Sequence, residues 1–180
     1  MSTKTKARRP AAYTIMDTAI GPLFVAACGG KLIAIKFGTD EKRAPEAVAS
    51  FERETHGAYA LERDDAALRK IAKHLRDYVD GRRKDLDIPF DVSWTNGFRR
   101  EVLLEVSRMP RGTVASYAEI ARRCGRPNAY RAVGNTMATN PIPLVIPCHR
   151  VVGSNGSLTG FGGGLDVKRH LLALEGATLV

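Results

Sequence analysis

The chain divides into two parts with different hydrophobic patterns, and this division constrains the fold more than any other feature of the sequence. Residues 13–38 contain short apolar runs separated by Ile20-Gly21-Pro22 and Gly29-Gly30, a pattern typical of antiparallel strands joined by turns. After Thr95, apolar residues recur instead at helical spacing. We therefore predict an α/β domain followed by a mainly helical domain, with the boundary at about residues 84 to 96.

Two helices of mixed charge are predicted after the strands, and a short strand is predicted to end the first domain. The second helix carries one apolar stripe and ends at Gly81. The stripe consists of Leu68, Ile71, Leu75, Tyr78 and Val79. The segment IPFDVSW, residues 88–94, has the composition of a strand. We assign residues 1–12 to a basic flexible arm, residues 13–90 to the α/β domain and residues 91–180 to the helical domain.

The helical part contains a helix-turn-helix pattern. Ser116 followed by Glu119 is a capping box, which predicts a helix that begins at Tyr117. A Gly-Arg-Pro turn ends this helix, and Asn128 is predicted to cap a second helix that runs to about Ala138. Two short helices joined by a tight turn are typical of DNA-binding modules, although many helical bundles contain them as well. The pattern carries a cluster of four arginines, Arg122, Arg123, Arg126 and Arg131.

The charge distribution favours a nucleic-acid partner. The net charge is +9, and the segment from Asn96 to Arg150 holds nine arginines, no lysine and three glutamates. Arginine without lysine suits contacts with phosphates and bases better than it suits solubility alone. The same excess would attract other polyanions, so charge by itself names no partner.

Other classes of protein are disfavoured by what the sequence lacks. No stretch of eighteen apolar residues exists, so we expect no membrane span, and the basic N-terminus has no apolar segment typical of a secretory signal. Three widely spaced cysteines suit a reducing cytoplasm better than a disulfide framework. The histidines and cysteines do not follow zinc-site spacing, so no metal is expected.

The segment IPLVIPCHRVVG, residues 142–153, is the strongest candidate for chemistry. Its apolar run is predicted to be a buried strand that breaks at Pro147 and presents Cys148 and His149 at its end. A nucleophilic thiol has to lose its proton, and a base such as His149 could lower the thiol pKa from about 8.5 to between roughly 3.5 and 7.5. A buried structural cysteine is the alternative interpretation.

The last helix supplies a candidate third member of such a site. Asp166 is predicted to cap it, and Gly176 to end it. Its buried stripe is expected to consist of Val167, Leu171 and Leu174. Glu175 falls in the last turn, where a negative charge opposes the helix dipole, so a local partner is expected. Glu175 could orient an imidazole and complete a Cys-His-Glu relay.

These residues lie in motifs that resemble the O6-alkylguanine-DNA alkyltransferases. The resemblance is dense from GTVASYAEIARRCG through RAVGNTMATNPIPLVIPCHRVVG to the final helix, and it continues more faintly back to TAIGPLFVAACGGKLIAIKF. It implies an N-terminal ribonuclease-H-like α/β domain, with an antiparallel sheet plus helices, and a winged-helix-like C-terminal domain. It also implies DNA repair by one irreversible alkyl transfer per molecule, without a cofactor.

The resemblance implies a role for each residue of the relay. Cys148 would attack the alkyl carbon as a thiolate, and His149 would act as the base through a water molecule. Glu175 would hold the imidazole, and Asn140 would brace the turn around the site.

Further positions would bind the DNA and extrude the base. Arg131 matches the arginine that enters the base stack, and Tyr117 matches the tyrosine that assists rotation of the nucleotide. Ala129 and Gly134 would allow close approach to the minor groove. The implied partner is double-stranded DNA with alkylated guanine, bound by a monomer that can cluster along DNA. O4-alkylthymine is an expected second substrate.

Met137, Phe161 and Gly162 are expected to line the substrate pocket. Phe161 stands where many relatives have a tyrosine, and Gly162-Gly163-Gly164 should loosen the loop around it. His170 is expected to be a packing or surface residue, and Cys28 and Cys124 are expected to be packing residues.

Three alternatives have other sequence requirements. A lesion-sensing relative that binds without transfer would lack the cysteine, whereas Cys148 is present. A helix-turn-helix regulator with a redox cysteine would read bases in the major groove and transfer no alkyl group. A cysteine hydrolase would leave the arginine-rich helices unexplained.

Overall fold

The computed structural model describes residues 7–177. The first half of the predicted basic arm, residues 1–6, therefore lies outside the described residues. The assignment of residues 9–12 to a flexible arm is wrong, because β1 (Arg9–Met16) begins at Arg9. The Arg8 side chain donates to the carbonyl oxygen of Tyr59 at 3.0 and 2.7 Å, and the Arg9 backbone N–H donates to the carbonyl of Ala58. These contacts with Ala58 and Tyr59 hold the segment before residue 13 in a defined position.

The N-terminal domain is built on a four-stranded sheet with the strand order β3-β2-β1-β4. Its other strands are β2 (Leu23–Cys28), β3 (Lys31–Phe37) and β4 (Tyr59–Arg63). The β1–β2 and β2–β3 pairs are antiparallel, which confirms the expected meander. The pairing of β4 with β1 is parallel and was not predicted. The short β4 has one buried residue, so its sequence carries little strand signal.

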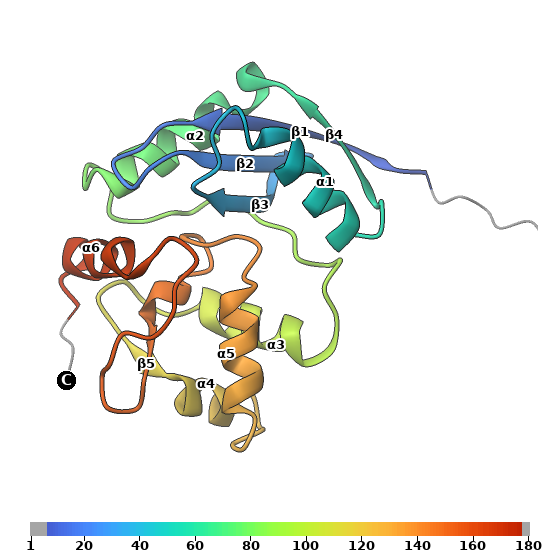
Figure 1. Cartoon of the computed structure of the whole chain (residues 1–180). Coiled ribbons are helices and arrows are strands. Elements are labelled where there is room, and N and C mark those ends of the chain that lie inside the picture. The colour runs from blue at the N-terminus through green and yellow to red at the C-terminus, as the bar shows by residue number, and fades with distance from the viewer. Residues whose placement is uncertain (1–6, 178–180) are drawn as a thin grey trace, which may run out of the picture.

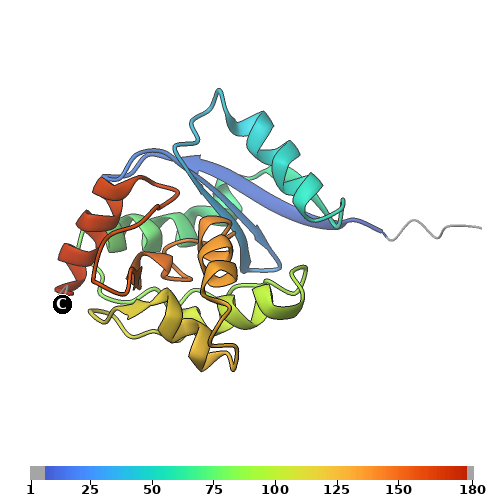
Figure 2. The ribbon, with the colours of Figure 1, turned by 60° about the horizontal axis from the view of Figure 1, so that its bottom comes forward.

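Two helices cover opposite faces of this sheet. They are α1 (Ala44–Glu54) and α2 (Asp65–Val79). Along β2 alternate side chains point to opposite faces, so Phe24 packs in the core beside α1 whereas Val25 packs in the core that α2 shares with the helical domain. Figure 2 shows α1 on the side of the sheet that faces away from that domain. The two domains therefore share one continuous core.

The C-terminal domain is mainly helical and contains the expected helix-turn-helix. Its helices are α3 (Gly97–Ser107), α4 (Tyr117–Arg123), α5 (Tyr130–Ala138) and α6 (Leu165–Glu175). A parallel pair of short strands, β5 (Ala115–Ser116) and β6 (Val151–Val152), and the 3₁₀ turn η1 (Cys148–Arg150) complete it. Figure 1 shows α4 and α5 packed together away from the sheet and α6 next to the α/β domain.

The helix ends confirm some capping predictions and correct others. Ser116 accepts a hydrogen bond from the backbone N–H of Glu119 at 3.1 Å, as the capping box predicts. The predicted caps Asn128 and Asp166 are wrong. Ala129 occupies the cap position of α5 without a side-chain bond, and α6 begins directly after Gly164, so that Asp166 lies in its first turn.

Two predicted strands are absent from the described residues. In residues 88–94 only a single bridge forms, between Phe90 and Leu32, where the carbonyl of Pro89 accepts from Leu32 at 2.8 Å. Residues 141–146 form a compact loop in which Leu144 has a φ of 75°. Proline lacks a backbone donor for a ladder, and the apolar run is interrupted by two of them. The run is buried as predicted, but as a loop.

This loop is anchored on the edge of the N-terminal sheet. The backbone N–H of Ile35 in the edge strand β3 donates to the carbonyl of Pro141 at 2.8 Å. Within the loop, the Asn140 side-chain amide donates to the carbonyl of Ile146 at 2.8 Å and accepts from the N–H of Ile142 at 3.0 Å. These bonds satisfy backbone groups that a strand would otherwise pair, and they hold the loop just ahead of Pro147.

Candidate active site

Cys148 is the first residue of η1, and its thiol is buried. The residue is 5% exposed and follows the loop that Asn140 braces. The predicted brace role of Asn140 agrees with this geometry, since both of its side-chain bonds lie within the turn that leads to Cys148. The backbone of Cys148 is therefore held in place, and its side chain is shielded from solvent.

The ionisation of this thiol differs from the prediction. Burial raises the pKa of Cys148 to about 11, while the Asn140 side chain and the Lys168 charge act in the opposite direction. We predicted a lowered pKa because the sequence places a histidine next to the cysteine. Desolvation dominates instead, so the resting thiol is neutral at physiological pH.

His149 is completely buried and is oriented by Glu175. Its Nε2 lies 2.7 Å from Oε1 of Glu175. A carboxylate only accepts hydrogen bonds, so Nε2 carries the proton and Nδ1 of the neutral ring has a lone pair. Nδ1 is buried and has no hydrogen-bond partner among residues 7–177. Burial lowers the pKa of His149, although Glu175 opposes this shift. The neutral imidazole is therefore ready to accept a proton at Nδ1.

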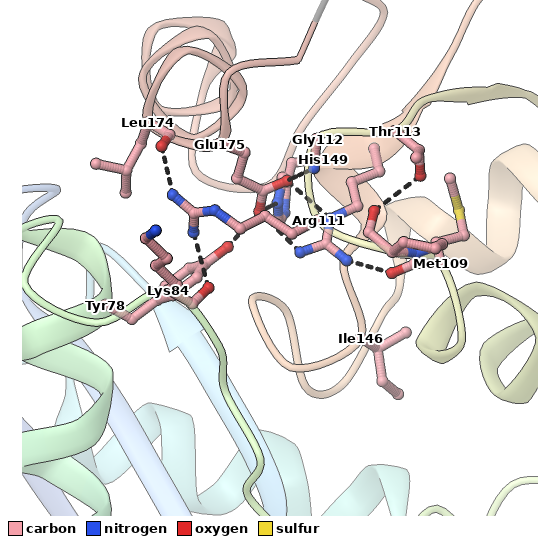
Figure 3. A network of polar contacts seen from close by, with 12 residues as sticks. Tyr78, Lys84, Met109, Arg111, Gly112, Thr113, Ile146, His149, Leu174 and Glu175 are labelled. Atoms are coloured by element: carbon pink, nitrogen blue, oxygen red, sulfur yellow. Dashed lines mark hydrogen bonds and ion pairs between the residues drawn. The ribbon is translucent and has the colours of Figure 1, made fainter.

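Glu175 is the centre of a network of donors, as Figure 3 shows. Arg150 donates from Nε to Oε2 at 2.8 Å and from Nη2 to Oε1 at 2.9 Å. The hydroxyl of Tyr78 donates to Oε1 as well. Burial alone would raise the pKa of Glu175, but the bonds from His149 and Arg150 outweigh it and hold the pKa well below its usual range. Glu175 is thus an ionised carboxylate inside the protein.

A local partner was expected for the acidic residue at the end of α6, and two arginines fill this role. Arg150 forms the ion pair, and the Arg111 side chain donates to the carbonyl of Leu174 in the last turn of α6 and to that of Lys84 at 2.8 Å. A cation bound to the last carbonyls of a helix offsets its dipole. None of these contacts was predicted from the sequence, where Arg150 had no assigned role and Tyr78 was expected only as part of an apolar stripe.

Lys168 is a further buried residue of the site that the sequence analysis missed. Its ammonium donates to the carbonyl of Val151 at 2.7 Å and to that of Thr159 at 3.2 Å. Burial lowers the pKa of Lys168, and the nearby Cys148 counteracts this. The buried face of α6 consists of Lys168, Leu171, Leu172 and Glu175. The helical spacing of positions 168, 171, 172 and 175 could have predicted that Lys168 is buried, because these four positions share one face of a helix.

A cavity of about 550 Å³ brings several predicted DNA and substrate residues together. It is lined by Tyr117, Tyr130, Gly134, Ala138, Thr159, Gly160, Phe161 and Gly162. The Tyr117 hydroxyl accepts a hydrogen bond from Thr159 at 2.9 Å, so its own hydrogen is left to donate. Met137 is not among the lining residues and packs in the core, where its helical spacing places it. Arg131 is exposed on α5, one residue after Tyr130.

The glycine loop beside this cavity is more constrained than its composition suggests. The ring of Phe161 packs against Phe37 of the N-terminal domain with a centroid distance of 5.3 Å. A Cβ atom on Gly163 would lie 3.1 Å from the Phe161 ring and 3.2 Å from the Phe37 ring. A side chain at position 163 would need these two rings to shift by a few tenths of an ångström, so close packing limits the expected looseness at this point.

Cys28, Cys124 and His170 lie in settings that suit packing or surface residues. Cys28 is buried with its thiol 3.3 Å from the carbonyl of Pro10, and Cys124 is partly buried. His170 is exposed, with Nε2 3.2 Å from the carbonyl of Val79. In the part of the chain that the structure describes, no group of histidine, cysteine and acidic residues could hold a metal ion. No helix there is long and apolar enough to cross a membrane.

A helix-turn-helix domain that carries a buried thiol beside a histidine–glutamate pair indicates the class of this protein: a DNA-binding protein with a candidate cysteine nucleophile. Two family models place it more closely. Residues 11–92 match the ribonuclease-like domain of 6-O-methylguanine DNA methyltransferase, and residues 97–177 match the DNA binding domain of the same enzyme. The chain belongs to the 6-O-methylguanine DNA methyltransferase family, which confirms the resemblance seen in the sequence.

Curated relatives agree with this assignment. The chain is 34% identical over 165 residues to a methylated-DNA–protein-cysteine methyltransferase of Methanosarcina acetivorans, a match that covers 92% of this chain and 98% of the relative. It is 36% identical over 163 residues to the enzyme of that name from Mycobacterium tuberculosis, covering 91% of each. Among solved structures, Mycobacterium tuberculosis OGT in complex with DNA is similar with a TM-score of 0.74 at 33% identity, over 91% of this chain and 92% of that one. The two-domain architecture is thereby confirmed.

Proposed function

We propose that this protein repairs DNA by moving an alkyl group from O6 of guanine to Sγ of Cys148, once per molecule. The observation that carries the proposal is the buried His149–Glu175 pair directly after the buried Cys148, in which the imidazole has its Nε2 bonded to the carboxylate and its Nδ1 without a partner among residues 7–177. The cavity beside Tyr117 and Phe161 is within the usual range for a small-molecule site and suits a planar base. The names of the relatives supply the substrate class.

The chemistry follows from the ionisation states. Because the resting thiol is neutral, its proton has to leave as the attack proceeds, and Nδ1 of His149, through a bridging water, is the acceptor. Glu175 stabilises the imidazolium that forms. The sulfur forms its new bond to the alkyl carbon in an SN2 step, and the electrons of the broken carbon–oxygen bond return to O6 of guanine. The product is a thioether, which water does not hydrolyse, so the cysteine is consumed.

Two buried or half-buried groups can assist this transfer. The charge of Lys168 favours the thiolate over the thiol. The Tyr117 hydroxyl is already bonded to Thr159 as an acceptor and can donate its hydrogen to the departing guanine. Both interactions strengthen as negative charge develops, which is the condition for lowering the barrier.

The alkylated guanine has to leave the duplex, because its O6 cannot reach a buried sulfur from within the base stack. Extrusion costs a few kcal/mol, and a side chain that fills the vacated space offsets part of that cost. Arg131 is exposed at the first turn of α5 and is positioned for this role. The small residues Ala129 and Gly134 allow α5 to approach the minor groove closely.

Arg131→Ala is expected to separate binding of the duplex from reactivity of the thiol. The variant should react with the free base O6-benzylguanine at the wild-type rate but repair an O6-methylguanine duplex roughly 5- to 150-fold more slowly, since a lost stacking contact is worth roughly 1–3 kcal/mol. Transfer rates on both substrates test this. The matched control is Arg122→Ala, another exposed arginine of the same motif, which should only weaken binding in a salt-dependent manner. Equal losses on the two substrates would contradict the role of Arg131.

The remaining proposals concern a second substrate, the oligomeric state and the cellular compartment. O4-alkylthymine carries its alkyl group on an oxygen beside a ring nitrogen, as O6-alkylguanine does, so we expect transfer from it as well. The protein acts as a monomer that can cluster along DNA, and its three cysteines, none of them in a disulfide, suit the cytoplasm.

The mass of the intact protein after reaction with a duplex that contains one O6-methylguanine tests the proposed function. One added methyl group per protein, located on the peptide that contains Cys148 and unchanged by further excess of substrate, is the expected result. Binding of the duplex without a gain in mass would exclude alkyl transfer and leave a protein that recognises the lesion. A methyl group that is lost again with time would exclude the single-turnover reaction.

A further inference from the structure

The Glu175 carboxylate is contacted by a side chain from the other domain. The Tyr78 hydroxyl in the last turn of α2 donates to Oε1 of Glu175, 97 residues away in the sequence. The same oxygen accepts from Nε2 of His149 at 2.7 Å and from Nη2 of Arg150 at 2.9 Å. Figure 3 shows the Tyr78 side chain extending from the N-terminal domain to this carboxylate. The N-terminal domain thus touches the relay directly.

These contacts saturate the carboxylate. A carboxylate has about four lone-pair sites, and Glu175 accepts on Oε2 from Nε of Arg150 at 2.8 Å and, more weakly, from the N–H of Gly112 at 3.4 Å, in addition to the three donors on Oε1. Each donor stabilises the negative charge and lowers the proton affinity of the group. The share of that charge available to His149 therefore depends on how many other donors compete for Oε1.

The hydroxyl of Tyr78 donates to Glu175 and also contacts the side chain of Arg150, so both of its neighbours belong to the network around the carboxylate. Tyr78 is 1% exposed, and its ring packs in the core shared by the two domains. A phenylalanine would fill this space equally well, whereas a buried hydroxyl without a partner is destabilising. The Arg111 guanidinium lies 5.8 Å from the ring centre and holds the end of α6 beside it. The hydroxyl of Tyr78 is therefore held by Glu175, and its ring is held by the surrounding core and by Arg111.

The other ionisable groups around the His149–Glu175 pair belong to the C-terminal domain. They are Arg150 and Cys148 of η1 and Lys168 of α6. Arg150 is a permanent cation, and its two bonds lie on both carboxylate oxygens. The Tyr78 bond is therefore the contact through which the N-terminal domain can influence the basicity of the imidazole.

We propose that Tyr78 is a positioning residue of the proton relay: its hydroxyl competes with His149 for Oε1 of Glu175 and so tunes the basicity of the His149 imidazole. This inference rests on the proposed function, because it needs His149 to act as the base. It makes the N-terminal domain a part of the catalytic apparatus through one hydrogen bond.

The direct test is the pH dependence of alkyl transfer from free O6-benzylguanine to the Tyr78→Phe variant. Without the hydroxyl, more of the Glu175 charge acts on His149 and favours the imidazolium, so the acid limb of the profile should shift to higher pH by a few tenths of a unit or more. Tyr59→Phe is the matched control. Tyr59 is equally buried, its hydroxyl accepts from Arg9 at 3.1 Å, and it packs in the core beside α1, which contains none of the relay residues. That variant should keep the wild-type profile.

A second variant keeps the inference testable if Tyr78→Phe does not fold. Incorporation of 3-fluorotyrosine at position 78 keeps the shape and makes the hydroxyl a stronger donor, so the acid limb should shift to lower pH. A wild-type profile in every variant at position 78 that folds would overturn the role of Tyr78 while leaving the proposed function intact. Absence of transfer to Cys148 in the wild-type protein would instead contradict the proposed function itself.

Discussion

Replacement of Cys148 by serine is expected to abolish alkyl transfer, with a rate loss of about 10⁴-fold or more, the scale seen when an enzyme nucleophile is removed. Serine has the same shape, so the 3₁₀ turn and the bonds of Asn140 should persist. Its hydroxyl is a much weaker nucleophile than a thiolate, and the His149–Glu175 pair cannot remove its proton as easily. Binding of the lesion-containing duplex should remain, since the exposed arginines of α4 and α5 are unchanged.

The other two cysteines provide the controls for this prediction. Cys28 lies in the N-terminal sheet and Cys124 at the end of α4, and neither contacts the relay. Cys28→Ser and Cys124→Ser should each transfer at the wild-type rate with one methyl group per protein. Residual methylation of the Cys148→Ser variant, or loss of methylation in the Cys124→Ser variant, would show that another residue accepts the methyl group. Intact mass and peptide mapping distinguish these outcomes.

Glu175→Gln is expected to give the second largest effect, a loss of about 10²–10⁴-fold in the rate of transfer, the range associated with general-base catalysis. Glutamine can still bond to His149, but it carries no charge to stabilise the imidazolium. The rate measured on free O6-benzylguanine at neutral pH tests this without any contribution from DNA binding. Glu101→Gln, at an exposed acidic residue of α3, should leave the rate unchanged.

The same substitution is expected to lower the free energy of unfolding. Arg150 would remain buried without its carboxylate, and a buried charge left without its partner costs roughly 3–5 kcal/mol. Because the pKa of Glu175 is held below its ordinary value, its contribution is complete above about pH 4.3 and is lost as the pH falls below that value. Urea denaturation should therefore show a large difference between wild type and Glu175→Gln at neutral pH that narrows in acid. A difference that stays constant with pH would show that Glu175 does not stabilise the fold as a carboxylate.

Features set by neighbouring residues were predicted correctly from the sequence. The turns at Gly21 and Gly29-Gly30, the stripe of α2 and the Ser116 cap are all local, and each appears in the structure. Where the prediction failed, a distant contact decided the outcome. The strand β4 exists because β1 pairs with it, and residues 141–146 form a loop because Asn140 and the edge of β3 satisfy their backbone.

The sequence by itself determined the family and the two-domain order, and it supplied Cys148, His149 and Glu175 as the candidate relay, because these depend on residue types in a recognisable order. Only the tertiary structure decided how these groups are ionised. Burial keeps the thiol neutral, and donors from Arg150 and Tyr78 keep the carboxylate charged. Desolvation and Coulomb energies depend on distances in space between residues far apart in the chain, and no local pattern of residues encodes those distances.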